Sequence, residues 1–365
     1  MNFDLDEQQR QMQDSLARLL AAELPLRRLQ SLVADGAQPP AALHDAVAGM
    51  GCYGLLVPAA YGGVGLGLLD AALAAEAFGR AAAPLPFIAS AGIVAHALAR
   101  FGSDAQRARW LPGIASGAVV AAAALSEWAA GQPGDVGGVQ AQDGRLRGEA
   151  SFVLDGGAAQ LFLLADQRGG LHLAEPGQAG VHHAPLQTFD RTRSVGTLTL
   201  DGCAAEPLGD AVGREALGTL LGVGRLLLAA DMLGAASAML DAATQYAQVR
   251  TQFGQPIGGF QAVKHLCADM AAQLVPCRAY VWGTAHAFDR NPAQGVAACA
   301  QLKAHLSEVG QFVARGAIEV HGGMGFTELA GLHLWFKRIG LSRQLLGGPT
   351  RLRAEAADAL FGTPA

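Results

Sequence analysis

Three short strings hold the residues best suited to chemistry, and each of them also has an ordinary structural interpretation. Arg250 opens the string Arg-Thr-Gln-Phe-Gly at the end of an apolar-periodic segment, where a helix dipole would favour a cation anyway. Gly322 and Gly323 stand where glycine lets backbone amides approach a ligand, or where it simply ends a helix. Ser126 closes an apolar run, where its hydroxyl suits either a ligand contact or a local turn.

Charge and cysteine usage argue against several other classes of site. The net charge of −5 gives no reason to expect nucleic acid or an anionic membrane surface as a partner. The five cysteines are scattered, with no spacing typical of a metal site or of a disulfide framework. The N-terminal string MNFDLDEQQR has neither a basic start nor an apolar core, so it does not resemble a signal peptide. We therefore expect a cytoplasmic protein with reduced, buried thiols.

The elements that must position these residues fall into three parts. Hydrophobic residues make up 51% of the chain and charged residues 16%, which argues for packed domains rather than disorder. Apolar periodicity and glycine stops predict N-terminal helices over 5–23, 43–50, 69–79, 93–101 and 105–115. Short apolar runs then predict strands over 119–125, 151–154, 160–165, 171–174 and 195–200. A helical period returns after Gly213, with apolar stripes over 228–247, 263–285 and 296–317 and a fourth candidate helix over 332–346.

This pattern predicts an α+β protein with an N-terminal helical domain, a small β-barrel or sandwich, and a C-terminal four-helix bundle. We place the boundaries at 1–120, 121–213 and 214–365.

The chain resembles the acyl-CoA dehydrogenase family in several strings that occur in the family's order over nearly its whole length. These strings are Tyr61-Gly62-Gly63, Ala124-Leu125-Ser126-Glu127, Arg250-Thr251-Gln252-Phe253-Gly254, Phe260-Gln261 and His321-Gly322-Gly323-Met324-Gly325-Phe326. Each string is weak alone, but their order and the independently predicted helix, strand and helix division make the resemblance strong. The resemblance implies FAD as the cofactor and an acyl-CoA thioester as the substrate, which loses its α-proton to a carboxylate and its β-hydride to the flavin.

The resemblance also implies roles for particular residues. Arg250 matches the arginine that holds the FAD pyrophosphate of a neighbouring subunit, a contact suited to its fork of donors. Gly322 and Gly323 match the loop whose amides approach the adenosine phosphate side of FAD, and Ser126 matches a contact with the flavin ring. Arg225 matches a residue near the catalytic base and the substrate. Within the same cofactor motif stand Gln252, Phe253 and Gln261.

Two positions depart from the family pattern at the flavin. Leu154 stands where flavin-binding relatives place a threonine, and it has no hydroxyl to donate to the ring. Glu319 stands where many relatives place a glutamine, and a carboxylate there would be repelled by a pyrophosphate. We therefore expect this chain to bind a flavin ring weakly in its own pocket. Its contacts with the FAD of a neighbouring subunit are expected to be better preserved.

The largest departure from the family pattern is the absence of a catalytic base. The two positions at which relatives place the catalytic glutamate are occupied by Gly347 and Gly224, and neither has an acid within two residues. Glu328 opens a predicted helix, where the dipole alone favours an acid, and the glutamate matching Glu127 is usually structural in the family. The catalytic residue is therefore unassigned.

The segment 332–338, Leu-His-Leu-Trp-Phe-Lys-Arg, resembles a family branch that acts on bulky ring-bearing acyl-CoAs, typically with steroid or bile-acid side chains. In that branch two paralogous chains pair into a heterotetramer, and one of them lacks the base. The sequence thus favours a non-catalytic partner subunit, in a heterotetramer or a homo-oligomer. Two alternatives remain: a self-sufficient dehydrogenase with a non-standard base, and a flavin-dependent monooxygenase of the same fold, which needs no α-proton base.

Overall fold

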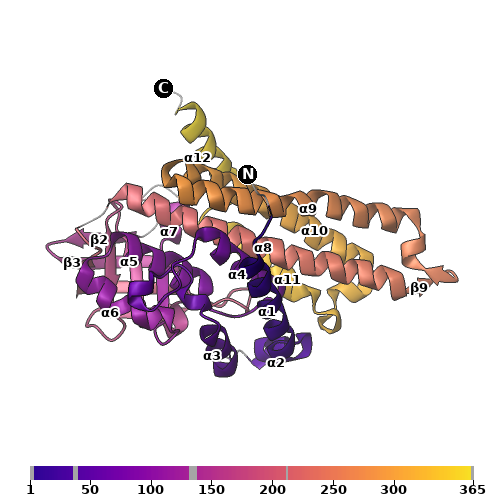
Figure 1. Cartoon of the computed structure of the whole chain (residues 1–365), viewed down its shortest axis with the longest axis horizontal. Coiled ribbons are helices and arrows are strands. Elements are labelled where there is room, and N and C mark those ends of the chain that lie inside the picture. The colour runs from indigo at the N-terminus through magenta and orange to yellow at the C-terminus, as the bar shows by residue number, and fades with distance from the viewer. Residues whose placement is uncertain (1–3, 36–39, 131–137, 211–212, 363–365) are drawn as a thin grey trace.

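The chain folds into three regions that follow one another in sequence (Figure 1). The computed structural model describes residues 4–35, 40–130, 138–210 and 213–362. A helical region comes first, a curled β-sheet lies in the middle, and long helices form a C-terminal bundle. The predicted fold class is therefore confirmed.

The N-terminal helices begin at residues that cap them. Asp6 accepts a hydrogen bond from the Gln9 amide at 2.8 Å, while the Gln9 side chain accepts one from the Asp6 amide, which makes a capping box for α1. Ser103 and Gln106 form the same reciprocal pair at the start of α6. The helical elements of this region are α1 (Glu7–Glu23), α2 (Leu26–Asp35), α3 (Ala41–Gly49), α4 (Leu68–Arg80), η3 (Phe87–Val94), α5 (Ala95–Phe101) and α6 (Asp104–Ala115).

The middle region is an eight-stranded sheet in the order β6-β7-β3-β1-β4-β5-β8, with β2 paired to β3, as far as the described residues show. The all-alanine β1 is buried between β3, which runs antiparallel to it, and β4, which runs parallel. Ser90 of η3 accepts a hydrogen bond from the Ala121 amide at 3.0 Å and so ties the sheet to the N-terminal helices. The strands are β1 (Ala121–Ala124), β2 (Gly138–Gln142), β3 (Arg145–Leu154), β4 (Leu161–Ala165), β5 (Leu171–Ala174), β6 (Val181–Pro185), β7 (Val195–Ala204) and β8 (Glu206–Pro207).

The C-terminal region is built around one long central helix, α8. It runs through the middle of the molecule and ends at the β9–β10 hairpin (Figure 1). By length and composition α8 could cross a membrane, but 94% of its most apolar window is buried inside the protein, so it is a core helix. The elements are α8 (Arg214–Val249), β9 (Thr251–Gln252), β10 (Gln255–Pro256), α9 (Gln261–Arg290), α10 (Pro292–His321), α11 (Leu332–Gln344) and α12 (Pro349–Phe361).

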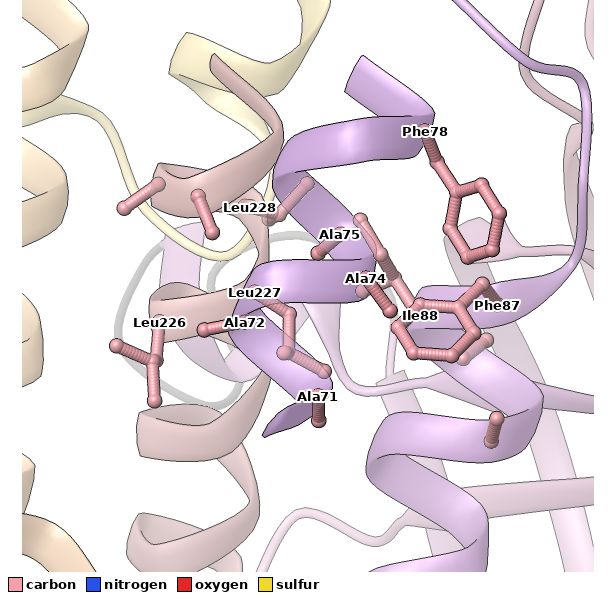
Figure 2. Packing of buried hydrophobic residues seen from close by; sticks show 14 of the residues in the cluster. Ala71, Ala72, Ala74, Ala75, Phe78, Phe87, Ile88, Leu226, Leu227 and Leu228 are labelled. Carbon is pink, nitrogen blue, oxygen red and sulfur yellow. The ribbon is translucent and has the colours of Figure 1, made fainter. Parts of the chain in front are cut away.

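Small residues let α4 lie close against α8. Figure 2 shows Ala72 and Ala75 of α4 beside Leu227 and Leu228 of α8, while Phe78 and Phe87 lie together on the other side of α4. A Cβ on Gly79 would lie 2.0 Å from the Asp231 carbonyl oxygen, so the backbones meet where no side chain fits. This contact fixes the N-terminal helices on the bundle and brings η3 to the middle of α8.

Candidate functional site

The two glycines predicted to occupy the family's base positions are brought near each other in the fold through Leu346. Gly224 is buried in the first half of α8, and Gly347 follows α11. A Cβ on Gly224 would lie 2.4 Å from the Leu346 Cδ1 atom and 2.8 Å from the Ile93 Cδ1 atom. Leu346, the residue before Gly347, thus fills the notch that Gly224 leaves, and Ile93 of η3 closes it from the other side. We call this arrangement the glycine pair.

Gly347 itself has a backbone that disfavours a side chain. Its φ is +107°, and a Cβ there would lie 2.9 Å from Leu352 and 3.3 Å from the Ala129 carbonyl oxygen. A glutamate at Gly224 would therefore require the Leu346 and Ile93 methyl groups to move, and a glutamate at Gly347 would strain the backbone.

Arg225, predicted to lie near the substrate, is almost wholly buried beside the glycine pair. Its Nε donates to the Leu346 carbonyl at 3.0 Å, and its guanidinium lies 2.8 Å from Glu355 of α12. Glu355 also accepts from Arg351 at 2.9 Å. The substrate role of Arg225 stays a prediction, while in the structure it holds the Leu346 backbone in place.

A lysine that the sequence analysis missed holds the connection between α11 and α12 in place at Gly347. Lys303 of α10 is completely buried, and its Nζ donates to the Gly347 carbonyl at 2.7 Å and to the Arg343 carbonyl at 3.2 Å. Burial, with further contributions from Arg225 and Arg343, holds the pKa of Lys303 well below its ordinary value. An amphipathic helix with a lysine on its apolar side was the signal that could have revealed it.

Neither candidate acid, Glu328 or Glu127, can be placed beside the glycine pair. Glu328 is exposed in η7 (Glu328–Ala330), before α11 begins, whereas Gly347 comes after α11 ends. Because α11 is 13 residues long, it separates the two by about 20 Å. The Glu127 side chain lies outside the described residues, so the structure says nothing of it.

The residues expected at a flavin ring lie at the end of the sheet nearest the start of α8. Ser126 begins α7 (Ser126–Ala130), and its hydroxyl donates to the Phe152 carbonyl at 2.9 Å. Leu154 is buried at the end of β3, 2% exposed. Neither residue therefore offers a free hydroxyl donor to a ring, and the predicted contact of Ser126 with a flavin stays a prediction.

The residues expected at a pyrophosphate lie together at the opposite end of the bundle. Arg250 and Gln252 are exposed at the hairpin, and no ion pair to the Arg250 guanidinium occurs among the described residues. Gln261 begins α9 directly after the hairpin, and Phe253 is 93% exposed. The exposed side chains make this end available to another molecule.

The glycine loop joins this end of the bundle. Tyr246 of α8 stacks on His321 of α10 with ring centroids 4.3 Å apart, which places Gly322 and Gly323 beside the hairpin. Both glycines are exposed, with no atom within 4 Å of an added Cβ, so their backbones are open to a ligand. Glu319, which differs from the family pattern, is also exposed and lies about one turn before the two glycines.

Helix α8 keeps the two groups of residues apart. Arg214, at its start, stacks over Trp128 of α7 with 5.5 Å from its Cζ to the ring centroid, and Arg250 follows its last residue. A helix of 36 residues is about 54 Å long. The ring-side residues and the phosphate-side residues of one chain therefore cannot contact one FAD molecule.

A buried charge network joins the bundle to the sheet, and the sequence analysis did not predict it. Asp231 of α8 pairs with Arg338 of α11 at 2.7 Å and with Arg193 of the β6–β7 loop at 2.6 Å. Arg338 also donates to the Thr192 hydroxyl at 2.8 Å. Asp231 is therefore held ionised, its pKa lowered by the two guanidinium groups despite its burial.

Two family descriptions match the chain. Residues 6–118 match the acyl-CoA dehydrogenase N-terminal domain, and residues 212–358 match the acyl-CoA dehydrogenase C-terminal domain. The acyl-CoA dehydrogenase IpdE2 of Mycolicibacterium smegmatis is 33% identical over 310 residues, which cover 84% of this chain and 85% of the relative. This chain belongs to the acyl-CoA dehydrogenase family. The family's members are FAD-dependent oxidoreductases that act on a CH–CH bond of an acyl-CoA.

Two similar solved structures have names that join two components. The ChsE4-ChsE5 complex from Mycobacterium tuberculosis matches with a TM-score of 0.88 and 29% identity over 100% of both chains. A Tcur3481-Tcur3483 steroid ACAD variant matches with a TM-score of 0.87 and 28% identity, over 97% of this chain and 98% of that one. The fold of this chain is thus similar to that of two structures whose names each join two components, one of them named as a complex.

Proposed function

We propose that this chain is the non-catalytic partner subunit of a heteromeric, FAD-dependent enzyme that desaturates an acyl-CoA thioester between Cα and Cβ. The glycine pair carries this proposal. Removal of the α-proton requires a positioned carboxylate, but Leu346 and Ile93 occupy the space at Gly224 and the backbone at Gly347 disfavours a side chain. A chain folded in this way has no base at either family position.

The residues of this chain fit the phosphate end of FAD and not its ring end. Arg250 and the amides of Gly322 and Gly323 are exposed together, a combination suited to a pyrophosphate. FAD, when bound, supplies the hydride acceptor. Since α8 separates these residues from Ser126 and Leu154, the FAD that they contact belongs to a neighbouring subunit. This chain would then complete a flavin site whose ring pocket and base lie on its partner.

We further propose that the partner is a paralogous acyl-CoA dehydrogenase chain and that the complex is cytoplasmic. The names of the ChsE4-ChsE5 and Tcur3481-Tcur3483 structures each join two components, which supports a heteromeric assembly for this chain. The Tcur name also mentions a steroid, which supports a bulky ring-bearing acyl group as the substrate class here. The sequence of 332–338 points to the same class.

The test compares the chain alone with the chain co-expressed with a paralogue that has a glutamate at the position of Gly347. Flavin content is measured from the visible absorption spectrum, and turnover with a ferrocenium acceptor and a panel of acyl-CoAs that includes a steroid side-chain thioester. We expect no flavin and no turnover from the chain alone, and both from the complex.

Other outcomes identify the alternatives. Stable yellow FAD that bleaches with acyl-CoA in the isolated chain would overturn the proposal and indicate a self-sufficient dehydrogenase. Incorporation of an oxygen atom into a substrate, with externally supplied reduced flavin, would indicate the monooxygenase.

A further inference from the structure

A cleft of about 690 Å³ opens between the N-terminal helices and the β6–β7 loop, and none of the residues of the glycine pair lines it. Its apolar walls include Leu85 and Pro86 before η3, and Leu186 and Val195 at the two ends of the loop. Its volume is in the range of small-molecule sites, roughly 300–1,000 Å³. We call it the Asp155 cleft, after the carboxylate in its wall.

Asp155 is an unusual residue for such a wall. It is only 9% exposed and follows β3 in the left-handed region, with a φ of 61°. One carboxylate oxygen accepts a hydrogen bond from the Ala89 amide of η3 at 3.3 Å. No hydrogen bond to the other oxygen occurs among the described residues. This second oxygen is not among the buried polar atoms that lack a partner, so it faces the cleft, where a donor could reach it.

The nearby guanidinium groups do not supply that donor. Asp231 takes direct contacts from Arg193 and Arg338. Asp190 accepts from the Thr192 amide and hydroxyl, at 2.8 and 2.6 Å, and lies 4.0 Å from Arg193. The cluster therefore contains three buried carboxylates and two guanidinium groups, and Asp155 is the carboxylate left without an ion-pair contact.

We propose that the Asp155 cleft binds a small molecule with a compact apolar body and a single hydrogen-bond donor, preferably a protonated amine, which donates to Asp155. The apolar walls would bury the body, and the donor would satisfy the unused carboxylate oxygen. A ligand cation would also balance the excess negative charge of the cluster. Asp190, Arg191 and Arg193 also line the cleft. The Arg193 guanidinium is paired with Asp231 at 2.6 Å, and Arg191 is exposed and therefore strongly screened by solvent. This site needs neither flavin nor a partner subunit, so it stands apart from the proposed function.

The experiment uses three probes that share one apolar body and differ in the head group: adamantylmethylamine, adamantylmethanol and adamantanecarboxylate. Binding to the full-length chain is measured by calorimetry near pH 8. We expect the amine to bind most tightly, the alcohol next and the carboxylate weakest, with roughly tenfold between the amine and the carboxylate. Equal affinities for the three probes, or no binding of the amine, would overturn the proposal.

If a probe binds, variants of the cleft show whether it binds there. Asp155→Asn should remove the preference for the amine over the alcohol, and the Asn side chain tolerates the left-handed backbone. Asp143→Asn is the matched control, since Asp143 is exposed with a φ of 50° in a turn outside the cleft. Ala158→Trp, at an exposed lining position, should abolish binding of all three probes. An unchanged amine preference in Asp155→Asn would show that the probe binds elsewhere.

Discussion

Gly224 and Gly347 show how a missing side chain can be replaced by the packing around it. The sequence reveals that both base positions lack a carboxylate, but not what occupies the space. Leu346 and Gly224 are distant in sequence, so only the fold shows that one fills the other's notch. The same limit applies to Asp231, Arg193 and Arg338, whose charges come together from three separate segments.

Restoring a glutamate at one glycine is expected to fail. In Gly224→Glu the new side chain collides with Leu346 and Ile93, and in Gly347→Glu the backbone is strained. Each variant should lose about 1–3 kcal/mol of stability, without ferrocenium reduction when tested alone. Gly218→Glu is the matched control, because it lies in the same helix with no atom within 4 Å of an added Cβ. Turnover by either single variant would show that the packing yields and that the flavin pocket works.

The stability cost of Asp155 can be measured through its pH dependence. Burial is the main cause that raises the pKa of Asp155 from 3.8 to about 6 in the folded state. The folded state then binds more protons than the unfolded state between these values, so stability falls as pH rises through this window. Two pKa units correspond to about 3 kcal/mol. Asp155→Asn should therefore be more stable than the wild type by about 1–3 kcal/mol at pH 8, and the difference should shrink towards pH 4.

Urea denaturation at the two pH values checks this expectation, with Asp143→Asn as the control at an exposed left-handed position. A destabilised Asp155→Asn protein at pH 8 would mean that the carboxylate is better paired than the geometry indicates. A stabilised variant fits a carboxylate retained for a ligand rather than for the fold.

At the scale of elements, the long helices and central strands were predictable and several edge elements were not. The strands β1, β4 and β5 are buried and apolar except for His172 in β5, which makes their runs obvious in the sequence. The missed β2, β6 and β8 have exposed, polar positions because they lie at sheet edges or pair only briefly. Helix α12 was missed because it packs mainly through Leu352 and Ala356, too few apolar residues to show a period.

The hairpin after α8 gives the element-scale prediction. Arg250→Ala should weaken FAD retention in the mixed complex by about 1.5–3 kcal/mol, because a charged, bidentate contact to pyrophosphate is lost. Bound flavin after gel filtration and its dissociation constant are the measurements. Arg290→Ala is the control, since Arg290 is another exposed cation at the end of a bundle helix. Unchanged flavin affinity would show that Arg250 is only a surface cation, favoured at this position by the helix dipole.

At the scale of the whole molecule, the hairpin end exposes several large apolar side chains. Between 75% and 93% of the surface is exposed at Phe253 in the hairpin, Phe326 in the glycine loop, Leu329 in η7 and Val249 at the end of α8. Such a group of side chains is typical of an interface. We expect multi-angle light scattering to show an oligomer, alone or with the paralogous chain. A monomer under both conditions would contradict the proposal that Arg250 acts on a neighbour.

Helix α8 also sets the register between the two ends of the molecule. Each residue inserted into it would move the hairpin by about 1.5 Å and turn it by about 100° around the helix axis. A single insertion or deletion between Gly224 and Arg250 would therefore leave the fold of the sheet intact but point the arginine away from the neighbour. Only changes near whole numbers of turns, such as seven or eleven residues, would restore its direction, and these would lengthen the molecule by about 10–17 Å. In the proposed flavin site between subunits, the spacing of these two residues thus matters as much as their chemistry.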